Sequence, residues 1–499
     1  MVYDWMKNLE NLNFTNTFIG LSPELYQAKS PDPVTEPYLI DFNAQAAKLI
    51  GLDPAESGRP EFAEYFAGNK LLAGSEPLAM AYSGHQFGSY NPRLGDGRGI
   101  LLGEVTNGNG HKWDIHLKGA GPTRFSRGFD GRATLRASIR EHLASEALHG
   151  LNIPTTRSLA IVGIRDLIYR QTPELAAVLV RISDSHVRFG SFELFHYTNN
   201  PNRVTELADY VIHHHHPDIE NEADRYQILF RRVLQKTAYL IAKWQAAGFV
   251  HGVMNTDNMC VTGVTFDYGP YGFIDRFDPG YTPNNSDTSG RYALGQQAQI
   301  GYWNLSKWGE ALCHLIDSED IMEELAGYQP TYNKIYRDLI GQKLGLGVLD
   351  SEFTELTGSL FQLLYNNPVD YTNFFRALSQ FPEENHTGLL NAFNNRNEIE
   401  DWLNRYRRLI EREGTTFMER KETMNRVNPK FLLRQYLLQR AIDKAVKEAD
   451  FSEIERLRVL LEDPFRDRPE IFKKYNIDPE FYASDTPDSL LGMQLSCSA

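Results

Sequence analysis

Runs of hydrophobic residues in the first half of the chain have the length and the turn signals of β-strands. Residues 99–105 and 113–118 form two such runs, and Asn-Gly-Asn-Gly at 107–110 separates them. Asparagine and glycine adopt the backbone angles of tight hairpin turns, so these residues predict a β-hairpin. Two further runs, at 158–162 and 176–182, predict strands as well.

Helical spacing of hydrophobic residues becomes the main pattern from about residue 190 onward. The longest amphipathic stretch is 226–247, and a strongly charged example is 430–447. One helix is also predicted among the strands, at 135–147. In each segment hydrophobic residues recur every three or four positions and so lie on one face. Residues 260–266 differ from their surroundings and predict two short strands joined by a tight turn.

A strand-rich first half followed by a helical second half predicts an α+β fold with two lobes and a cleft between them. We place the N-lobe at residues 76–188 and the C-lobe at 189–499, with the junction near 183–192. Residues 1–75 combine short helical patterns with proline-rich joints. We interpret them as an N-terminal extension that wraps the core and has no chemistry of its own.

Composition narrows the classes of function. The 499 residues include 51 basic and 65 acidic side chains, a net charge of −14, and 41% are hydrophobic. A negative chain of this kind is a poor binder of nucleic acid, which needs basic surface. The sequence shows no secretory signal and no apolar run of ~18 residues, and three cysteines are too few for a disulfide framework. These features predict a soluble cytoplasmic protein without nucleic-acid or membrane partners, and a monomer is favoured.

The segment 251–258, His-Gly-Val-Met-Asn-Thr-Asp-Asn, has the frame of a kinase catalytic loop, H-x-D-x-x-x-x-N. Asp267-Tyr-Gly follows nine positions later, where a kinase has its metal-binding D-F-G triplet. Val253 stands where a kinase keeps its catalytic aspartate, and an acid is found at Asp257 instead. A site that keeps its metal ligands but moves its acid indicates ATP chemistry other than ordinary phosphorylation.

Asn258 and Asp267 are the predicted metal ligands. Magnesium prefers hard oxygen ligands, keeps several waters and is shared with substrate phosphates, which suits one amide oxygen and one carboxylate. Manganese is an alternative metal for the same donors. A plain turn would also explain Asp267-Tyr-Gly, but the upstream residues in register favour metal binding. Asp257 then lies beside the metal, either as a supporting carboxylate or as the base that deprotonates an acceptor hydroxyl.

Glycine alternates with polar residues just before the strand at 99–105, and this pattern is a candidate phosphate-binding loop. Gly95 and Gly97 allow backbone N–H groups to approach a phosphate, and Arg98 adds a guanidinium. The same pattern occurs in many plain turns. The segment 82–88, Tyr-Ser-Gly-His-Gln-Phe-Gly, offers no nucleophile with a base, and we interpret it as a support for the glycine-rich loop.

Lys118 ends the strand at 113–118, where a lysine is usually a solvated edge charge. In a kinase-like lobe, the lysine of the third strand instead contacts phosphate and pairs with a glutamate on the following helix. Glu141 and Glu146 are both candidates for that partner. The residue pattern alone leaves the choice between them open.

Four more polar or glycine positions lie close to the predicted helix and the lobe junction. They are Asp130, Gly131, Arg181 and Arg188. Arginine beside a nucleotide cleft can bind phosphate, but most arginines are surface residues. Taken singly, each of these positions is best explained as an ordinary turn or surface residue.

Together the motifs resemble the selenoprotein O family of protein adenylyltransferases, which have a kinase fold. The resemblance extends over most of the chain, from residue 82 to the C-terminal tail. Its motifs are Tyr-Ser-Gly-His-Gln-Phe-Gly at 82–88, Leu-Lys-Gly-Ala-Gly at 117–121, Ser-Ile-Arg-Glu at 138–141, Met-Asn-Thr-Asp-Asn at 254–258, Asp-Tyr-Gly-Pro at 267–270 and Met-Asn-Arg-Val-Asn-Pro at 424–429. Several are long and unusual, which makes the match specific.

The resemblance implies a bilobal protein-kinase-like fold and a pseudokinase that AMPylates proteins. ATP would bind flipped relative to ordinary kinases, so that AMP passes from ATP–Mg²⁺ to Ser, Thr or Tyr hydroxyls of protein substrates. The implied nucleotide contacts are Gly95, Gly97, Arg98, Lys118, Asp130, Gly131, Arg181 and Arg188. The implied metal ligands are Asn258 and Asp267, the implied proton acceptor is Asp257, and the implied partner of Lys118 is Glu141.

Cys497 lies third from the end of the chain, where animal members of that family carry selenocysteine. The resemblance therefore implies a redox role for this thiol. Some bacterial members pair a terminal cysteine with one in the segment after D-Y-G, but residues 277–287 contain none. An intrachain disulfide switch of that kind is not expected here.

Two other functions are compatible with parts of the pattern. A small-molecule or protein phosphotransferase would use a similar loop, but Val253 replaces its catalytic aspartate. A catalytically inactive nucleotide-binding scaffold would be expected to lack its metal ligands, whereas Asn258 and Asp267 are both present. Both functions stand as alternatives to AMP transfer.

Overall fold

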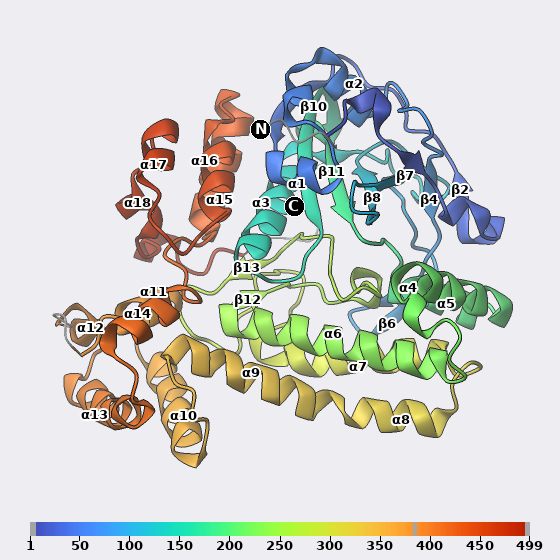
Figure 1. Ribbon diagram of the computed structural model, residues 1–499. Coiled ribbons are helices and arrows are strands. Elements are labelled where there is room, and N and C mark those ends of the chain that lie inside the picture. Colours follow the sequence, from blue (N-terminus) through green and yellow to red (C-terminus); the bar gives the residue numbers. More distant parts are fainter. Residues whose placement is uncertain (1–5, 383–386, 495–499) are drawn as a thin grey trace.

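The computed structural model describes residues 6–382 and 387–494. An antiparallel sheet organises the N-terminal half and helices form most of the remainder, so the fold is mixed α+β, as predicted (Figure 1). The strand order along the sheet is β2-β4-β7-β8-β11-β10-β3, with β1 beside β7 and β9 beside β11. β4 spans Leu78–Met80 and β9 spans Ala133–Thr134. The strands nearest the site are β7 (Gly99–Thr106), β8 (Lys112–Lys118), β10 (Arg157–Tyr169) and β11 (Pro173–Ser183).

The predicted hairpin is present between β7 and β8, and both later strands are confirmed. The helix predicted at 135–147 is α3 (Leu135–Gly150), and the hydroxyl of Thr134 caps it by accepting the N–H of Ala137. α3 is buried around almost its whole circumference because the sheet lies on one side and α15 (Gln435–Asp443) and α16 (Ser452–Leu461) cover the other (Figure 1). Its side chains are therefore fixed by packing on every face.

Residues 6–75 add strands to the sheet, which the sequence pattern did not indicate. The added strands are β1 (Phe14–Thr15), β2 (Tyr26–Ala28) and β3 (Tyr38–Phe42). They pair with β7, β4 and β10, so their backbone groups find partners in strands far away in sequence. Local periodicity cannot reveal such pairing. The expected short helices are present as α1 (Ala44–Leu49) and α2 (Pro60–Ala67), which pack near β10 and β3.

The helical half begins after β11 and forms two groups in Figure 1. The group beneath the sheet comprises α4 (Phe189–Tyr197), α5 (Pro201–His215), α6 (Arg225–Ala247), α7 (Gln297–Ala311), α8 (Ser318–Ala326) and α9 (Tyr328–Leu344). The second group lies to one side and includes α10 (Ser351–Asn366), α11 (Tyr371–Leu378), α13 (Arg396–Glu413), α14 (Phe417–Asn425), α15, α16, α17 (Pro469–Tyr475) and α18 (Pro479–Ala483). The predicted helix at 226–247 is α6, which ends at the left-handed Gly248.

Two local predictions were wrong. Residues 260–266 turn as expected, but they form only isolated bridges, such as Met259 with Thr265, and no strands. The segment 430–447 is helical only from Gln435 onward. Its first residues are extended because the N–H groups of Lys430 and Phe431 both donate to the carbonyl oxygen of Pro464. Tertiary hydrogen bonds override the helical pattern there.

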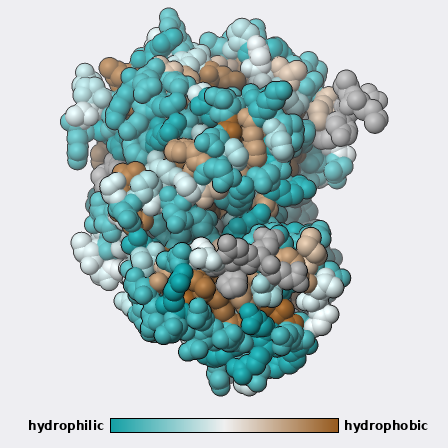
Figure 2. Space-filling model, turned by 90° about the vertical axis from the view of Figure 1, so that its left-hand side faces the viewer, coloured by the Kyte–Doolittle hydropathy of each residue, from teal (hydrophilic) through white to brown (hydrophobic). Residues whose placement is uncertain are grey.

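The surface is mainly hydrophilic on the face shown in Figure 2, as expected for a chain with 23% charged residues. The face that carries α17, α18 and α13 is largely hydrophilic, with hydrophobic residues in small patches (Figure 2). None of the helices in residues 6–382 and 387–494 has the length and hydrophobicity needed to span a bilayer.

Candidate active site

A cavity of about 680 Å³ lies between the sheet with α3 on one side and the loops of the helical half on the other. It brings together every predicted site residue of the described chain. The predicted residues that line it are Gly95, Gly97, Arg98, Lys118, Asp130, Gly131, Glu141, Arg181, Arg188, Asp257, Asn258 and Asp267. Cys497 lies outside the described residues.

Asp267 is the centre of the charged groups in this cavity. Its Oδ1 accepts from Lys118 Nζ at 2.7 Å and from Arg181 Nη2 at 2.5 Å, and its Oδ2 accepts from Arg188 Nη1 at 3.0 Å. Burial alone would raise the pKa of Asp267, but Arg181, Lys118 and Arg188 hold it well below its usual value. The residue also has a left-handed backbone, φ +63°, which is uncommon outside glycine. Asp267 is therefore an ionised anion held by three cations.

Lys118 and Glu141 are in contact, as the resemblance implied. Lys118 Nζ lies 2.6 Å from Glu141 Oε2, and the other carboxylate oxygen accepts from Arg181 Nε at 2.6 Å. The competing residue, Glu146, lies further along α3 and instead binds Arg157 through two hydrogen bonds of 2.7 and 2.9 Å. Burial lowers the pKa of Lys118, and the carboxylates of Asp267 and Glu141 oppose that change.

Arg188 joins the sheet to the catalytic loop. Its guanidinium lies between the rings of Tyr82 and Phe266, at 4.3 and 4.1 Å from their centres. The same guanidinium donates to the carbonyl oxygen of Asp257 at 2.8 Å. Arg188 is 2% exposed, so its interactions are shielded from solvent screening. Its position fixes Asp257 relative to Asp267.

The predicted metal donors lie on neighbouring loops. Asn258, in the 3₁₀ turn Thr256–Asn258, donates its side-chain N–H to the carbonyl oxygen of Val253 at 2.8 Å. Its amide nitrogen is thereby used, and Oδ1 is the atom left to bind a cation. Asn258 Oδ1 and the carboxylate of Asp267 fit magnesium, which needs few protein ligands when phosphates and waters complete its shell. The described residues hold no cluster of three His, Cys, Asp or Glu side chains suited to a metal.

Asp257 has one satisfied and one unsatisfied carboxylate oxygen. Gln86 Nε2 donates to Oδ2 at 3.2 Å, whereas Oδ1 is buried and has no hydrogen-bond partner among the described residues. Burial raises the pKa of Asp257 to about 7, and Arg188 opposes that rise. A carboxylate with a raised pKa and a free oxygen can accept a proton.

The segment 82–88 contacts the catalytic loop more directly than the glycine-rich loop that it was predicted to support. The N–H of His85 donates to Thr256 Oγ1 at 2.7 Å, and Gln86 binds Asp257. Gly84 lies so close that a β-carbon there would be 2.7 Å from Asp257 Oδ1. These contacts join residues about 170 positions apart, so no local pattern could have indicated them.

The glycine-rich loop is fixed from both sides. Asp96 forms two hydrogen bonds with the backbone of Met80, of 3.0 and 3.1 Å. A β-carbon at Gly95 would lie 2.5 Å from the ring of Phe125, and Gly95 has a left-handed backbone, φ +105°. Glycine at this position therefore allows the loop to pass beneath Phe125 while its backbone faces the cavity.

Asp130 and Gly131 lie at the rim, away from the Asp267 cluster. The carboxylate of Asp130 is paired with Arg170 at 2.7 and 3.0 Å. Arg127, Arg132 and Arg170 also line the cavity. Sequence reasoning missed Arg127 and Arg170, and it interpreted Arg132, which follows Gly131, as a surface residue. Arg170 follows β10 and carries no motif, so only the folded hairpin brings it to the site.

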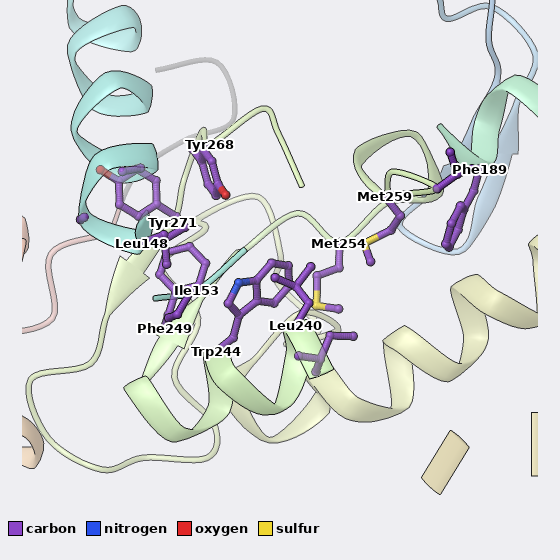
Figure 3. Packing of buried hydrophobic residues seen from close by; sticks show 14 of the residues in the cluster. Leu148, Ile153, Phe189, Leu240, Trp244, Phe249, Met254, Met259, Tyr268 and Tyr271 are labelled. Atoms are coloured by element: carbon purple, nitrogen blue, oxygen red, sulfur yellow. The ribbon is translucent and has the colours of Figure 1, made fainter. Parts of the chain in front are cut away.

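A hydrophobic cluster supports the catalytic loop from below. Figure 3 shows Trp244, Phe249, Tyr268 and Tyr271 packed together beside α6. The ring of Trp244 lies 5.4 Å from that of His251, the first residue of the loop. Tyr268 and Tyr271 reach the N-terminal half, where their hydroxyls contact Thr155 Oγ1 at 2.5 Å and the carbonyl oxygen of Arg140 at 2.9 Å. The loop is thus held on a rigid base.

Comparison with known proteins shows which family this sequence resembles. Residues 8–462 match the family model described as "Protein adenylyltransferase SelO". The chain is 47% identical to "Protein nucleotidyltransferase YdiU" of Myxococcus xanthus over 497 residues, which cover 99% of this chain and 100% of the relative. Proteins of the same name from Thioalkalivibrio sulfidiphilus and Pseudomonas fluorescens are 46% and 44% identical, again over 99% of this chain and all of the relative.

Proposed function

Since the chain belongs to the SelO family of protein adenylyltransferases, we propose that its central cavity binds ATP and transfers AMP to protein hydroxyls. The chain is a protein nucleotidyltransferase by this membership, and the proposal concerns how its residues perform the reaction. The observation that carries it is the cluster in which Lys118, Arg181 and Arg188 meet Asp267 beside the free oxygen of Asp257.

The nucleotide is held mainly by charge. Lys118, Arg181 and Arg188 are buried cations on one wall, and Arg98 lies with the glycine-rich loop on another. Together they match the negative charge of a triphosphate in a site where water screens little. Gly95 and Gly97 allow the backbone to approach a phosphate, and Asp130 and Gly131 contact the nucleotide from the rim.

Asn258 and Asp267 would hold Mg²⁺, with Mn²⁺ as the alternative metal. Both residues already line the same cavity. When bound, the metal neutralises phosphate charge and polarises the bonds to phosphorus. Glu141 positions Lys118, and through Arg181 it also positions Asp267.

The transfer step uses Asp257 as the proton acceptor. The hydroxyl oxygen of a Ser, Thr or Tyr side chain forms a bond to the α-phosphorus of ATP, the bond from that phosphorus to the bridging oxygen breaks, and pyrophosphate leaves. The hydroxyl proton passes to the free Oδ1 of Asp257. This requires the α-phosphate to face the acceptor, so we propose that ATP binds flipped relative to kinases. Val253 has no atom that could take the proton instead.

The arrangement of parts supports a kinase-like, bilobal fold. A glycine-rich loop, a strand lysine, a helical glutamate and a loop with metal donors surround one cavity in that order along the chain. We accordingly assign the N-lobe to residues 76–188 and the C-lobe to 189–499, with 1–75 as an extension whose strands complete the sheet.

ATP labelled separately at the α- and γ-phosphates tests the proposal. The protein is incubated with each label, with magnesium as the sole metal, in the presence of an extract of bacterial proteins. We expect protein-bound label from the α-position only. The Asp257→Asn variant serves as the matched control because it keeps the shape of the side chain but removes the base. Protein-bound label from the γ-position would instead establish a kinase.

A further inference from the structure

A second, smaller cavity of about 80 Å³ lies in the helical half, away from the nucleotide site. It forms where the ends of α6 and α9 meet the segment after α3, and the two cavities share no lining residue. Its walls are mainly hydrophobic, with Ile153, Ala246, Val427 and Phe465 among them. Figure 3 shows that Ile153 also packs in the cluster beneath the catalytic loop.

Lys343, in the last turn of α9, gives this cavity an unusual charge. The residue is 6% exposed, and its ammonium has no carboxylate or other hydrogen-bond acceptor among the described residues. The ammonium lies over the rings of Phe375 and Tyr371, at 4.3 and 5.4 Å from their centres. Burying an ammonium without an anion is costly, and burial lowers the pKa of Lys343 to about 7.

The other polar groups of the cavity do not supply the missing anion. Two more basic residues, Lys243 and Arg426, line the cavity. None of the described residues that line it is acidic. Thr372, which is 3% exposed, also lines the cavity, and its hydroxyl makes no hydrogen bond among the described residues. Two largely buried residues that can donate hydrogen bonds, Lys343 and Thr372, thus line the cavity and are available to a ligand.

The segment 424–429, one of the motifs that carry the family resemblance, builds a wall of this cavity and lies outside the nucleotide site. Asn428 Nδ2 donates to the carbonyl oxygen of Lys343 at 2.8 Å. Arg376 Nη1 in turn donates to the carbonyl oxygens of Asn425 and Asn428, at 3.1 and 3.0 Å. These bonds fix the wall against the end of α9, so the cavity is a built feature.

We propose that this cavity is a binding site for a small organic monocarboxylate. The carboxylate pairs with the ammonium of Lys343 and accepts from the hydroxyl of Thr372, and a short apolar chain lies against the hydrophobic walls. A single negative charge matches the one buried cation. Inorganic phosphate fits less well because it has no apolar part to replace the solvent it would lose.

Calorimetric titration of the full-length protein with sodium butyrate, at constant ionic strength, tests the proposal. We expect one butyrate per chain, and binding of butyramide at least about tenfold weaker, because a charge-assisted hydrogen bond is lost. Inorganic phosphate should also bind more weakly than butyrate, because it has no apolar part to lie against the hydrophobic walls. Lys343→Met keeps the volume of the side chain and should weaken butyrate binding by a similar factor. Lys334→Met, at an exposed position of the same helix, should leave it unchanged.

A second measurement on the unmutated protein keeps the test independent of the variant's folding. Because an anion stabilises the ammonium, butyrate binding near pH 8 should be accompanied by proton uptake, measured by titration in buffers of different ionisation heat. Lys243 and Arg426 are the other charged groups lining the cavity in the described chain. Absence of butyrate binding, equal binding of butyramide, or binding without proton uptake would each overturn the proposal.

Discussion

Two buried lysines have opposite surroundings in this protein. Lys118 lies in the active-site cavity between the carboxylates of Asp267 and Glu141, whereas Lys343 lies over aromatic rings with no carboxylate in the described chain. Burial lowers the pKa of both amines, to about 7 for Lys343, and at Lys118 the two carboxylates oppose the change. Burial alone therefore does not identify a catalytic cation, because the neighbouring anions decide how the charge is held.

The largest effect on AMP transfer should follow from removing the carboxylate of Asp267, which pairs with Lys118. Asp267→Ala takes away both a proposed metal ligand and the shared partner of three cations. We expect AMP transfer to fall by about 10³-fold or more, equivalent to several kcal/mol of transition-state stabilisation. Transfer of α-labelled AMP with magnesium as the sole metal measures the loss.

Asp338→Ala, at a surface position of α9, is the matched control and should transfer normally. Because Asp267→Ala leaves three cations with one anion fewer, circular dichroism must first establish that it folds. Asp267→Asn, which keeps the side-chain shape, should be impaired as well. Near-normal transfer by a folded Asp267→Ala enzyme would falsify the assignment of Asp267.

A large effect on AMP transfer is also expected when the carboxylate of Asp257 is removed. Asp257→Asn should slow AMP transfer by about 10²–10⁴-fold, the usual contribution of a general base, and leave nucleotide affinity much less affected. Separate measurements of the turnover number and of the dissociation constant of ATP distinguish a loss of catalysis from a loss of nucleotide binding. Val253→Asp should not by itself create a kinase. If Asp257→Asn transferred AMP at the normal rate, another group would have to be the proton acceptor.

The pairing of Lys118 with Glu141 should produce non-additive losses. Lys118→Met and Glu141→Gln should each reduce AMP transfer by about tenfold or more, and the double variant should lose far less than the product of the two, because contacting residues act as a unit. Glu146→Gln on the same helix is the control, since its carboxylate binds Arg157 instead. Additive losses would mean that the ion pair has no part in catalysis.

Lys343 should affect stability and leave AMP transfer nearly unchanged. The folded-state pKa of about 7 lies below the unfolded value of ~10.4, so the unfolded chain holds the proton more tightly and stability is lost as the pH falls from about 10 to about 7. Lys343→Met should therefore be more stable than the original protein by a few kcal/mol near pH 7, and by much less near pH 10. Urea unfolding at both pH values tests this, and a pH-independent difference would contradict it.

The sequence predicted those parts of the fold and site that depend on local pattern. The hairpin at 107–110, α3 and α6 follow from turn chemistry and periodicity. The spacing of Asn258 and Asp267 predicts that both are metal donors, and the structure brings the two residues to one cavity. Each of these signals is contained within a short segment. The family resemblance added the choice of Glu141 over Glu146, which local spacing left open.

What the sequence missed depends on contacts between distant segments. The strands β1 to β3 form because sheet edges far along the chain pair with them. Arg170 reaches the cavity only because β10 and β11 fold back on each other, and the unpaired ammonium of Lys343 is a property of its buried surroundings. Residue type alone does not distinguish these two side chains from the many arginines and lysines that lie in solvent.

Gly84 leaves the space that the carboxylate of the proposed base, Asp257, occupies. The smallest added side chain there would lie 2.7 Å from the free oxygen of Asp257 and 3.0 Å from its β-carbon, so the carboxylate would have to be displaced. The position of the Asp257 carboxylate therefore depends partly on a residue that bears no functional group and lies 173 positions earlier in the chain. A chemist wishing to tune the proton transfer could do so from position 84 and leave every charged residue of the cavity intact.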